Sequence, residues 1–187
     1  MKLIMLDTET TGLSPAKGDR MVEIGAIKMD GRKILSGKKG VFHHYINPDR
    51  DIPPHVTRIH GIDNARVSNF PRFGDIAHLF LEFIEGATLV IHNATFDLNF
   101  IMHELHLNQF PNIDEVPVID TLALARKKHP NQKNNLDALC DRYSIERDHR
   151  ELHGALLDSK LLAQVYLSLS EGEPLSLSQP ASNFVQL

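Results

Sequence analysis

The stretch that decides the fold is an apolar run leading into two acids: Leu3-Ile4-Met5-Leu6-Asp7-Thr8-Glu9-Thr10-Thr11-Gly12. Side chains alternate between the two faces of a strand, so Asp7 and Glu9 should share a face with Leu3 and Met5, opposite Thr8. Two carboxylates this close raise each other's pKa unless a cation lies between them, and Mg²⁺ and Mn²⁺ prefer such oxygen ligands. A strand that frays into a polar loop would give the same pattern, so a metal site requires more acids downstream.

Length and composition indicate one ordinary folded domain. The chain has 187 residues, of which 42% are hydrophobic and 24% charged, and its formal net charge is −4. This charge argues against binding of nucleic acid by bulk electrostatics, although a carboxylate-rich nuclease site counts as negative until cations load it. The single cysteine, Cys140, fits a small core residue in a reducing cytoplasm, and no apolar run could span a bilayer. We therefore expect a cytoplasmic protein with no signal peptide and no membrane partner.

The order of the predicted elements is that of an α/β fold. After the opening strand we expect strands at residues 21–29, 38–46, 87–91 and 116–119. Helices are expected at about 52–60, from Pro71 to Gly86, after an Asn93 cap, from Asp120 to about Lys128, after an Asn135 cap, and after Gly154. An antiparallel start followed by parallel strands predicts a five-stranded mixed sheet, three antiparallel strands and then two parallel ones, flanked by helices.

Two further acids lie on the apolar stripes of predicted helices. Asp97 lies on the stripe of Phe100, Ile101 and Leu105, and Asp158 on that of Ala155, Leu162, Val165 and Leu169. An acid at a core position is costly unless it is paired or bound to a metal. His153 precedes Asp158 by five residues, about 140° around an ideal helix. We therefore expect His153 on the loop or first turn, from which it could reach whatever Asp158 binds.

Four carboxylates and a histidine in one such fold are what two-metal phosphoryl chemistry needs. One cation activates the water and the other stabilises the leaving oxygen, with roughly 3.5–4 Å between the two. A histidine near neutral pKa supplies the base that takes the proton of the water. The sequence therefore predicts a site built from Asp7, Glu9, Asp97, His153 and Asp158.

Three motifs carry a specific resemblance to a known family. D-T-E-T-T-G at 7–12, H-N-A-T-F-D at 92–97 and H-G-A-L-L-D at 153–158 resemble the three motifs of the DEDDh (DnaQ-like) 3′–5′ exonucleases. A histidine five residues before the last aspartate marks the DEDDh branch, whereas the DEDDy branch has a tyrosine at the position of Gly154. The resemblance implies a ribonuclease H-like fold.

Within this family the chain resembles most the epsilon proofreading subunits of bacterial DNA polymerase III. The features that carry this likeness are I-H-G-I at 59–62, N-L-D-A-L-C at 135–140 and L-H-G-A-L-L-D at 152–158, and the similarity extends over about residues 2–170. It implies a single-stranded DNA 3′ end as substrate. It also implies the polymerase III alpha subunit, a theta-like subunit and the sliding clamp as partners.

The resemblance also implies a role for each motif residue. The site would bind two divalent cations, Mg²⁺ or Mn²⁺: Asp7, Glu9 and Asp158 would hold the first, and Asp7 would bridge to the second. Asp97 would act largely through bound water, and His153 would be the general base.

A second set of residues would contact the substrate. The resemblance assigns this role to Thr10, Gly12, Leu13, Ile59 and His60, with the two apolar side chains wedged against the terminal base. Leu13 and Ile59 also fit ordinary core or loop anchors, and His60 also fits a packed or capping histidine.

After Ser170 the chain becomes rich in serine, proline and glutamine. We therefore expect an exonuclease domain over residues 1–170 and a flexible tail over 171–187. Within the tail, Q-P-A-S-N-F loosely resembles a clamp-binding peptide, in which Gln179 and Phe184 would contact the clamp. A chance likeness explains these six residues equally well.

The leading hypothesis is a metal-dependent 3′–5′ exodeoxyribonuclease that removes mispaired 3′ nucleotides for a replicative polymerase. The alternatives are a relative that trims RNA or short oligonucleotides, and a replisome scaffold whose nuclease site is incidental. The basic run at 126–129 fits either a solvated helix end or a contact to a DNA backbone.

Overall fold

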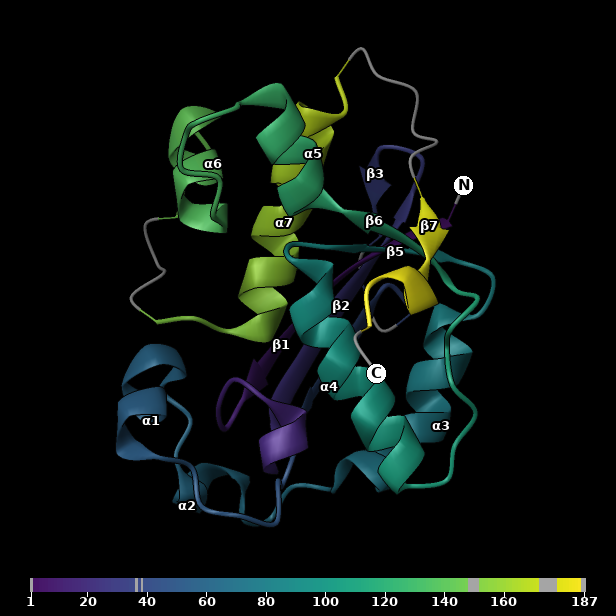
Figure 1. The fold of residues 1–187 in the computed structure, drawn as a ribbon, viewed down its shortest axis with the longest axis vertical. Coiled ribbons are helices and arrows are strands. Elements are labelled where there is room, and N and C mark those ends of the chain that lie inside the picture. The colour runs from purple at the N-terminus through teal and green to yellow at the C-terminus, as the bar shows by residue number, and fades with distance from the viewer. Residues whose placement is uncertain (1, 36, 38, 148–151, 172–177, 186–187) are drawn as a thin grey trace.

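A mixed β-sheet forms the centre of the molecule (Figure 1), in a computed structural model that describes residues 2–35, 37, 39–147, 152–171 and 178–185. The strand order is β3-β2-β1-β5-β6-β7, and β4 also pairs with β2. β1 (Lys2–Thr10) is antiparallel to β2 (Met21–Asp30) and parallel to β5 (Thr88–Ile91), which is parallel to β6 (Pro117–Asp120). The predicted α/β class, with an antiparallel start and parallel later strands, is confirmed.

Within the described residues the sheet has seven strands, where the sequence predicts five. β3 (Lys33–Ile34) and β7 (Gln179–Pro180) are the additional strands, and the strand predicted at 38–46 is β4 (Val41–Tyr45), with residue 38 outside the described part. Two-residue strands are too short to show an alternating pattern, so only pairing with a neighbouring strand defines them.

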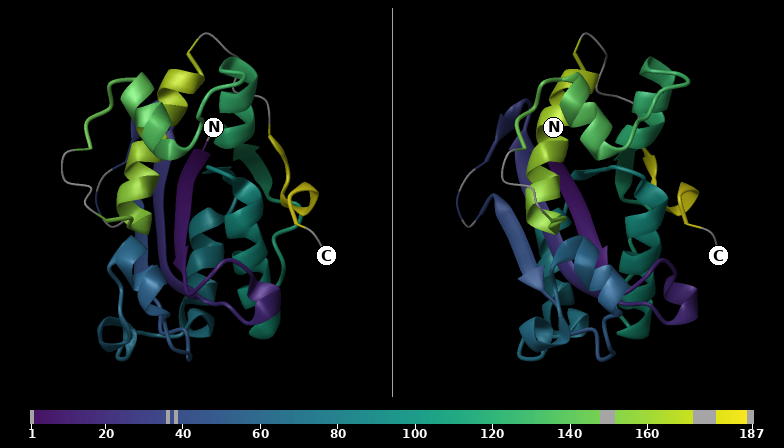
Figure 2. Two further views of the ribbon diagram at one scale, coloured as in Figure 1. Left: turned by 60° about the vertical axis from the view of Figure 1, so that its left-hand side comes forward. Right: turned by 90° about the vertical axis from the view of Figure 1, so that its left-hand side faces the viewer.

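Helices cover both faces of the sheet (Figure 2). α3 (Phe73–Ile84) and α4 (Ala94–Leu107) pack on the face that carries Ile4 and Leu6 of β1. α5 (Thr121–Lys128), α6 (Leu136–Arg142) and α7 (Ala155–Leu169) pack on the face that carries Leu3 and Met5. This confirms the predicted alternation along β1. α1 (Pro54–His60) and α2 (Asn64–Val67) enclose a smaller cluster around Val22.

Two of the three predicted helix caps are formed by side chains. Asp120 accepts a hydrogen bond from the Leu122 N–H, and Asn135 accepts one from the Ala138 N–H. Asn93 does precede α4, but its side chain makes no capping bond and its backbone is left-handed, with φ 69°. Here the prediction is wrong, because a residue with this backbone cannot aim its side chain at the first turn in the usual way. α3 starts at Phe73, two residues later than predicted, and the four-residue α2 was not expected.

The described end of the predicted tail lies against the sheet. β7 pairs antiparallel with β6, and the Ala181 N–H, in the short helix η2 (Ala181–Asn183), donates to the Val116 carbonyl at 2.9 Å. Phe184 and Val185 pack against the core on the α3–α4 face. Residues 172–177 and 186–187 of the predicted tail lie outside the described residues, so the domain limit at residue 170 stays a prediction.

Two predictions from composition concern the core and the surface. Cys140 on α6 is fully buried, and burial raises the pKa of its thiol to about 11, so it packs as a small, unreactive core residue. Among the described residues, no helix has both the length and the apolar character needed to cross a membrane.

Candidate active site

The carboxyl ends of two neighbouring parallel strands bring the first acids together. β1 and β5 run side by side with Leu6 opposite Ile91, so both chains leave the sheet at the same edge. Asp7 and Glu9 lie on β1 at this edge, and the turn after β5 leads into α4, whose first turn carries Asp97. Because β1 and β5 are parallel neighbours, Asp7 and Asp97 lie at the same edge of the sheet although they are 90 residues apart in the sequence.

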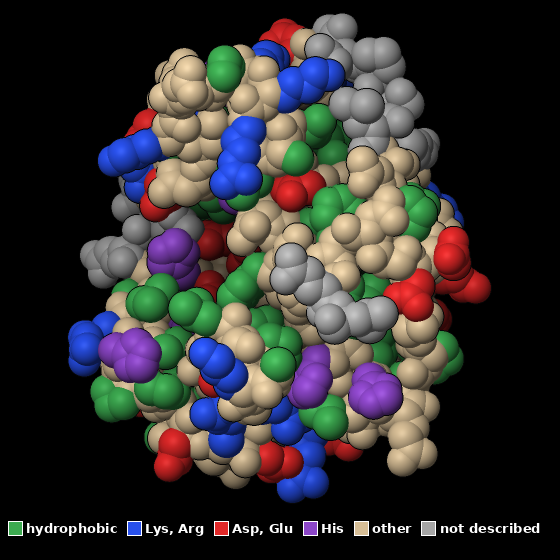
Figure 3. Space-filling model, in the orientation of Figure 1, with side chains coloured by type: hydrophobic (Ala, Val, Ile, Leu, Met, Phe, Trp, Pro, Cys, Tyr) green, Lys and Arg blue, Asp and Glu red, His purple; other side chains and the backbone are tan. Residues whose placement is uncertain are grey.

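The cleft above this edge is lined by three of the five residues predicted to be catalytic. Asp7, His153 and Asp158 line a single cavity of about 460 Å³, whose far wall is formed by α5, the start of α6 and the loop between them. Figure 3 shows acidic side chains at the bottom of a hollow in this part of the surface. The third motif reaches the cleft through α7, which carries Asp158 in its first turn.

Two of the predicted metal ligands and the predicted general base form a compact group. Oxygen or nitrogen atoms of Glu9, His153 and Asp158 all lie within 4.8 Å of one another. His153 Nδ1 is 3.3 Å from Asp158 Oδ2, and the histidine ring is exposed while the carboxylate is buried. His153 lies in the loop before α7, as its spacing from Asp158 predicted.

Burial and mutual repulsion destabilise the charged forms of these acids. The pKa of Asp7 is raised well above its usual value by burial first and then by the nearby carboxyl groups of Asp97, Glu9 and Asp158. Burial raises the pKa of Asp97 to about 7, although a hydrogen bond of 2.7 Å from the Thr8 hydroxyl opposes the rise. Carboxylates in this condition are stabilised by divalent cations, which restore the charged form.

Another buried acid shows the contrasting arrangement. Glu104 on α4 is 1% exposed, yet both of its oxygens accept bonds of 2.7 Å from the Arg20 guanidinium. This bidentate pair compensates the burial of the charge within the protein. The structure therefore distinguishes an acid stabilised by its own arginine from acids that raise each other's pKa in an open cleft.

Glu23 on β2 is a site residue that the sequence reasoning missed. It lies opposite Glu9 in the β1–β2 pairing, is buried, and accepts hydrogen bonds from His43 Nε2 at 2.7 Å and from the Ala155 N–H at 3.1 Å. Because Ala155 is the first residue of α7, Glu23 fixes the start of the helix that carries Asp158. A charged residue inside the apolar strand at 21–29 was the available signal.

β2 and α7 are also in direct backbone contact near Glu23. A Cβ added to Gly25 would lie 2.3 Å from the Ala155 carbonyl carbon, and the Gly25 carbonyl accepts a hydrogen bond of 2.8 Å from the Ser159 hydroxyl. Glycine at this position therefore allows α7 to lie close enough to the sheet for Asp158 to reach the cleft.

The two apolar residues assigned to the substrate are exposed near the site. Leu13 is 86% exposed and Ile59 is 50% exposed, so neither is an ordinary core residue. The Ile59 carbonyl accepts a hydrogen bond of 3.1 Å from the His153 N–H, which ties the end of α1 to the loop of the histidine. Thr10 and Gly12 form the turn between β1 and Leu13, where the Thr10 hydroxyl donates to the Gly12 carbonyl at 2.6 Å.

His60 is buried below this surface and has both ring nitrogens engaged. Its Nδ1 accepts from the Ile62 N–H at 3.0 Å, so Nε2 carries the proton and donates to the Thr10 carbonyl at 3.3 Å. Burial lowers its pKa, which keeps the ring neutral. This geometry favours the packed histidine over the substrate contact, because His60 joins α1 to the end of β1.

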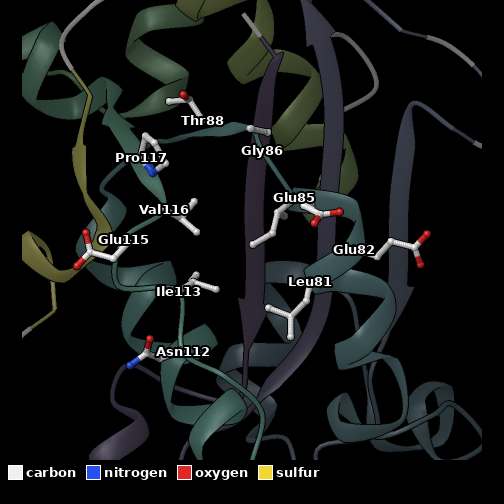
Figure 4. Close-up of a pocket in the computed structure, with 12 residues that line it drawn as sticks. Leu81, Glu82, Glu85, Gly86, Thr88, Asn112, Ile113, Glu115, Val116 and Pro117 are labelled. Atoms are coloured by element: carbon white, nitrogen blue, oxygen red, sulfur yellow. The ribbon is translucent and has the colours of Figure 1, made fainter.

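The remaining predicted residues and the larger cavity lie elsewhere. Gln179 and Phe184 are not among the residues that line the cleft. A hollow of about 750 Å³ lies at the amino ends of β5 and β6, with Leu81, Ile113 and Val116 among its lining residues (Figure 4). None of the predicted catalytic residues lines it.

Comparison with known proteins agrees with this geometry. The family model described as "Exonuclease" matches residues 4–166. The DNA polymerase III subunit epsilon of Rickettsia felis is 50% identical over 175 residues, covering 92% of this chain and 75% of the relative. The subunit of the same name from Escherichia coli K12 is 42% identical over 177 residues, covering 91% and 72%.

Solved structures share the fold. Exonuclease X in complex with 5′ overhanging duplex DNA superposes with a TM-score of 0.70 at 28% identity, covering 90% of this chain and 91% of that one. Exonuclease I superposes with a TM-score of 0.79 at 18% identity, covering 92% and 41%, and supports the fold alone. With its three motifs gathered around one cleft, the chain belongs to the exonuclease family, among the 3′–5′ exonucleases that include the epsilon subunits of DNA polymerase III.

Proposed function

We propose that the chain is the proofreading exonuclease of a replicative DNA polymerase, which hydrolyses the last phosphodiester bond at the 3′ end of single-stranded DNA. The observation that carries this proposal is the group of Asp7, Glu9, Asp97 and Asp158, whose carboxyl groups raise the pKa of Asp7 beside the exposed ring of His153. Hydrolysis of a phosphodiester requires stabilisation of negative charge, and the acids alone repel it. Their arrangement is therefore explained by cations that the site would hold.

The residues fit two divalent cations, Mg²⁺ or Mn²⁺. Asp7, Glu9 and Asp158 would be the direct ligands, and Asp97, held by the Thr8 hydroxyl, would act at a greater distance. Bound there, the cations would supply the Lewis acidity that activates a water and stabilises charge on the leaving oxygen.

His153 would take the proton of the attacking water. Its ring is half-exposed at the mouth of the cleft, so the proton can pass on to solvent, and its contact with Asp158 orients the imidazole. The loop that carries it is fixed by the bond from its N–H to the Ile59 carbonyl. The same ring could instead serve as a third ligand beside Glu9 and Asp158, because all three lie within 4.8 Å.

Leu13 and Ile59 would hold the terminal base. Exposed aliphatic side chains at the two ends of the β1–α1 region offer apolar contact to a base without reading its identity. This suits an enzyme that removes any mispaired nucleotide. Thr10 and Gly12 would contribute backbone contacts to the terminal sugar, and His60 would keep that backbone in place.

The test is digestion of a 5′-labelled single-stranded DNA oligonucleotide with Mg²⁺, Mn²⁺ or EDTA, beside RNA of the same sequence and with Asp7→Ala as control. Stepwise release of mononucleotides from DNA that stops in EDTA and in D7A is the expected result. Faster loss of RNA would favour the RNA-trimming alternative. Absence of cleavage with either cation would favour the scaffold.

The partners belong to the same proposal. The relatives' name, DNA polymerase III subunit epsilon, supports assembly with a polymerase III alpha subunit in the cytoplasm. A theta-like subunit and a sliding clamp contacted by Gln179 and Phe184 are the further partners that we propose. Co-elution of the purified chain with each candidate subunit in size-exclusion chromatography tests each pairing separately.

A further inference from the structure

The last turn of α5 carries three cations, Arg126, Lys127 and Lys128, and each has different surroundings. Lys128 donates from Nζ to the carbonyls of Ser168 and Leu169 at 3.3 and 3.2 Å, so it caps the C-terminal end of α7. Lys127 is exposed and does not line the cleft. Arg126 does line it, in the same cavity as Asp7 and Asp158.

Arg126 is available for a ligand. It is exposed, and no hydrogen bond or salt bridge joins it to any residue within the described ranges. Its charge acts on the cleft, since it contributes to lowering the pKa of His92, a neighbour in the same cavity whose pKa is lowered mainly by burial. A guanidinium left unpaired at the wall of a cleft whose floor is acidic would be drawn to the negative group that enters with the substrate.

The wall beside Arg126 is fixed by hydrogen bonds. Asn134 donates to the carbonyls of His129 and Gln132, and its own Oδ1 accepts from Arg142 Nη1 at 3.1 Å. Arg142 Nη2 also donates to the Lys133 carbonyl at 2.8 Å. The loop between α5 and α6 therefore keeps its shape, and a strand can lie along it without first ordering the protein.

The two ends of the site define the direction of the strand. Leu13 and Ile59 are absent from the lining of this cleft, and α1 lies on the other side of the β1 end from α5 and α6 (Figure 1). If the terminal base lies against Leu13 and Ile59 and the scissile phosphate at the carboxylates, the preceding nucleotides must leave toward the α5–α6 wall. The next phosphate then faces Arg126.

We propose that Arg126 binds the phosphodiester immediately 5′ of the scissile one, and so makes the site select a strand rather than a single nucleotide. This inference rests on the proposed exonuclease function. Arg126 makes no contact with the reacting atoms in this arrangement, so it is a positioning residue whose effect depends on the length of the substrate.

The test compares two substrates that present the same thymidine 5′-phosphate to the carboxylates and differ in what is attached to it, so each variant is compared with the parent on each substrate. One is a single-stranded dT oligonucleotide, and the other is the p-nitrophenyl ester of thymidine 5′-monophosphate, which has no second phosphate. Arg126→Ala should raise the ratio of the oligonucleotide KM to the ester KM about tenfold. Arg126→Lys, which keeps the charge but loses the planar fork, should fall between R126A and the parent. Lys127→Ala, the adjacent cation outside the cleft, is the matched control and should leave both KM values unchanged.

Salt dependence gives a readout that needs no turnover. Binding of a labelled dT oligonucleotide is measured by fluorescence anisotropy, with Ca²⁺ in place of Mg²⁺, at several salt concentrations. Loss of one phosphate contact should reduce the slope of log K against log [salt] by about 0.7 in R126A and not in K127A.

Two results would overturn the proposal. If R126A raises the KM of the oligonucleotide and of the ester by the same factor, Arg126 acts on the catalytic centre. If neither KM value nor the salt slope of binding changes, Arg126 is a solvated cation. If the parent releases no nucleotide from DNA, the exonuclease proposal fails, while the anisotropy slopes still decide the role of Arg126.

Discussion

In the folded protein without metal, the charged forms of the Asp7 and Asp97 carboxyl groups are disfavoured. Burial and neighbouring acids raise its pKa well above the usual value of 3.8, and burial raises that of Asp97 to about 7. The folded protein without metal therefore binds protons more tightly than the unfolded chain. The stability contributed in this way is fully present below about pH 3.8, and the part due to Asp97 is lost as the pH rises through about 7. The part due to Asp7 is lost as the pH rises through its own raised pKa.

Replacement of this carboxylate should remove much of the effect. We expect Asp7→Asn to raise the melting temperature in EDTA at pH 8 by roughly 2–4 °C, or about 1 kcal/mol, because repulsion is relieved. The difference from the parent should shrink as the pH falls, because protonation of Asp7 in the parent relieves the same repulsion that the substitution removes. Thermal melts from pH 4.5 to 8 check this, and a large loss of melting temperature in D7N would contradict it. Turnover should be abolished.

One substitution of His153 distinguishes its two possible roles, general base and metal ligand. If the ring is the general base, His153→Ala should lower kcat by about 10²–10⁴-fold and leave Mn²⁺ affinity near the parent value. The two quantities are measured by single-turnover cleavage and by isothermal titration with Mn²⁺. Loss of Mn²⁺ affinity would instead identify the ring as a ligand beside Glu9 and Asp158, and an unchanged kcat would remove it from the mechanism.

At the scale of elements, the site depends on how α7 is seated on β2. Glu23 holds the Ala155 N–H at the helix start, Gly25 permits the close approach, and Ser159 bonds back to the strand. None of these residues need touch a substrate. Their effect is to place the first turn of α7, with Asp158, beside the acids of β1.

Glu23→Ala should therefore damage stability and activity together. It leaves the Ala155 N–H and the His43 ring without their shared acceptor, which we expect to cost about 1–3 kcal/mol and to lower kcat tenfold or more. Glu23→Gln keeps an oxygen that can accept from the Ala155 N–H and should retain most of both. Thermal melts and cleavage rates of the two variants are the measurements. Equal behaviour of E23A and E23Q would show that the bond to α7 is not what matters.

At the scale of the whole molecule, the described C-terminal residues add an edge strand, β7, beside β6. A chain that ends after residue 178 loses the β6–β7 pairing, the buried Ala181 and the packing of Phe184 and Val185. We expect its melting temperature to fall by about 4–8 °C, or about 2 kcal/mol, with cleavage retained because these residues do not line the cleft. A chain that ends after residue 185 is the control. An independent tail would give the same melting temperature in both.

The sequence by itself determined the longer strands and helices and singled out the five motif residues as candidates for the site. Side chains alternate between the two faces of a strand, which placed Asp7 and Glu9 of the first strand on the face of Leu3 and Met5. Apolar stripes on the predicted helices marked Asp97 and Asp158 as acids at buried positions. These patterns are local, because the period of a strand or a helix fixes which side chains share a face wherever the element lies. Motif spacing then distinguished the histidine branch.

Only the tertiary structure decided which other residues lie beside the five motif residues. Glu23 became a site residue because β2 pairs with β1 and touches α7, and Arg126 joined the cleft because α5 lies on the side of the sheet that Asp7 faces. β7 exists through its pairing with β6, and His60 is buried through contacts of α1 with Thr10. Such relations join segments that are far apart in the chain. Packing and strand order fix them, and no local periodicity encodes either one.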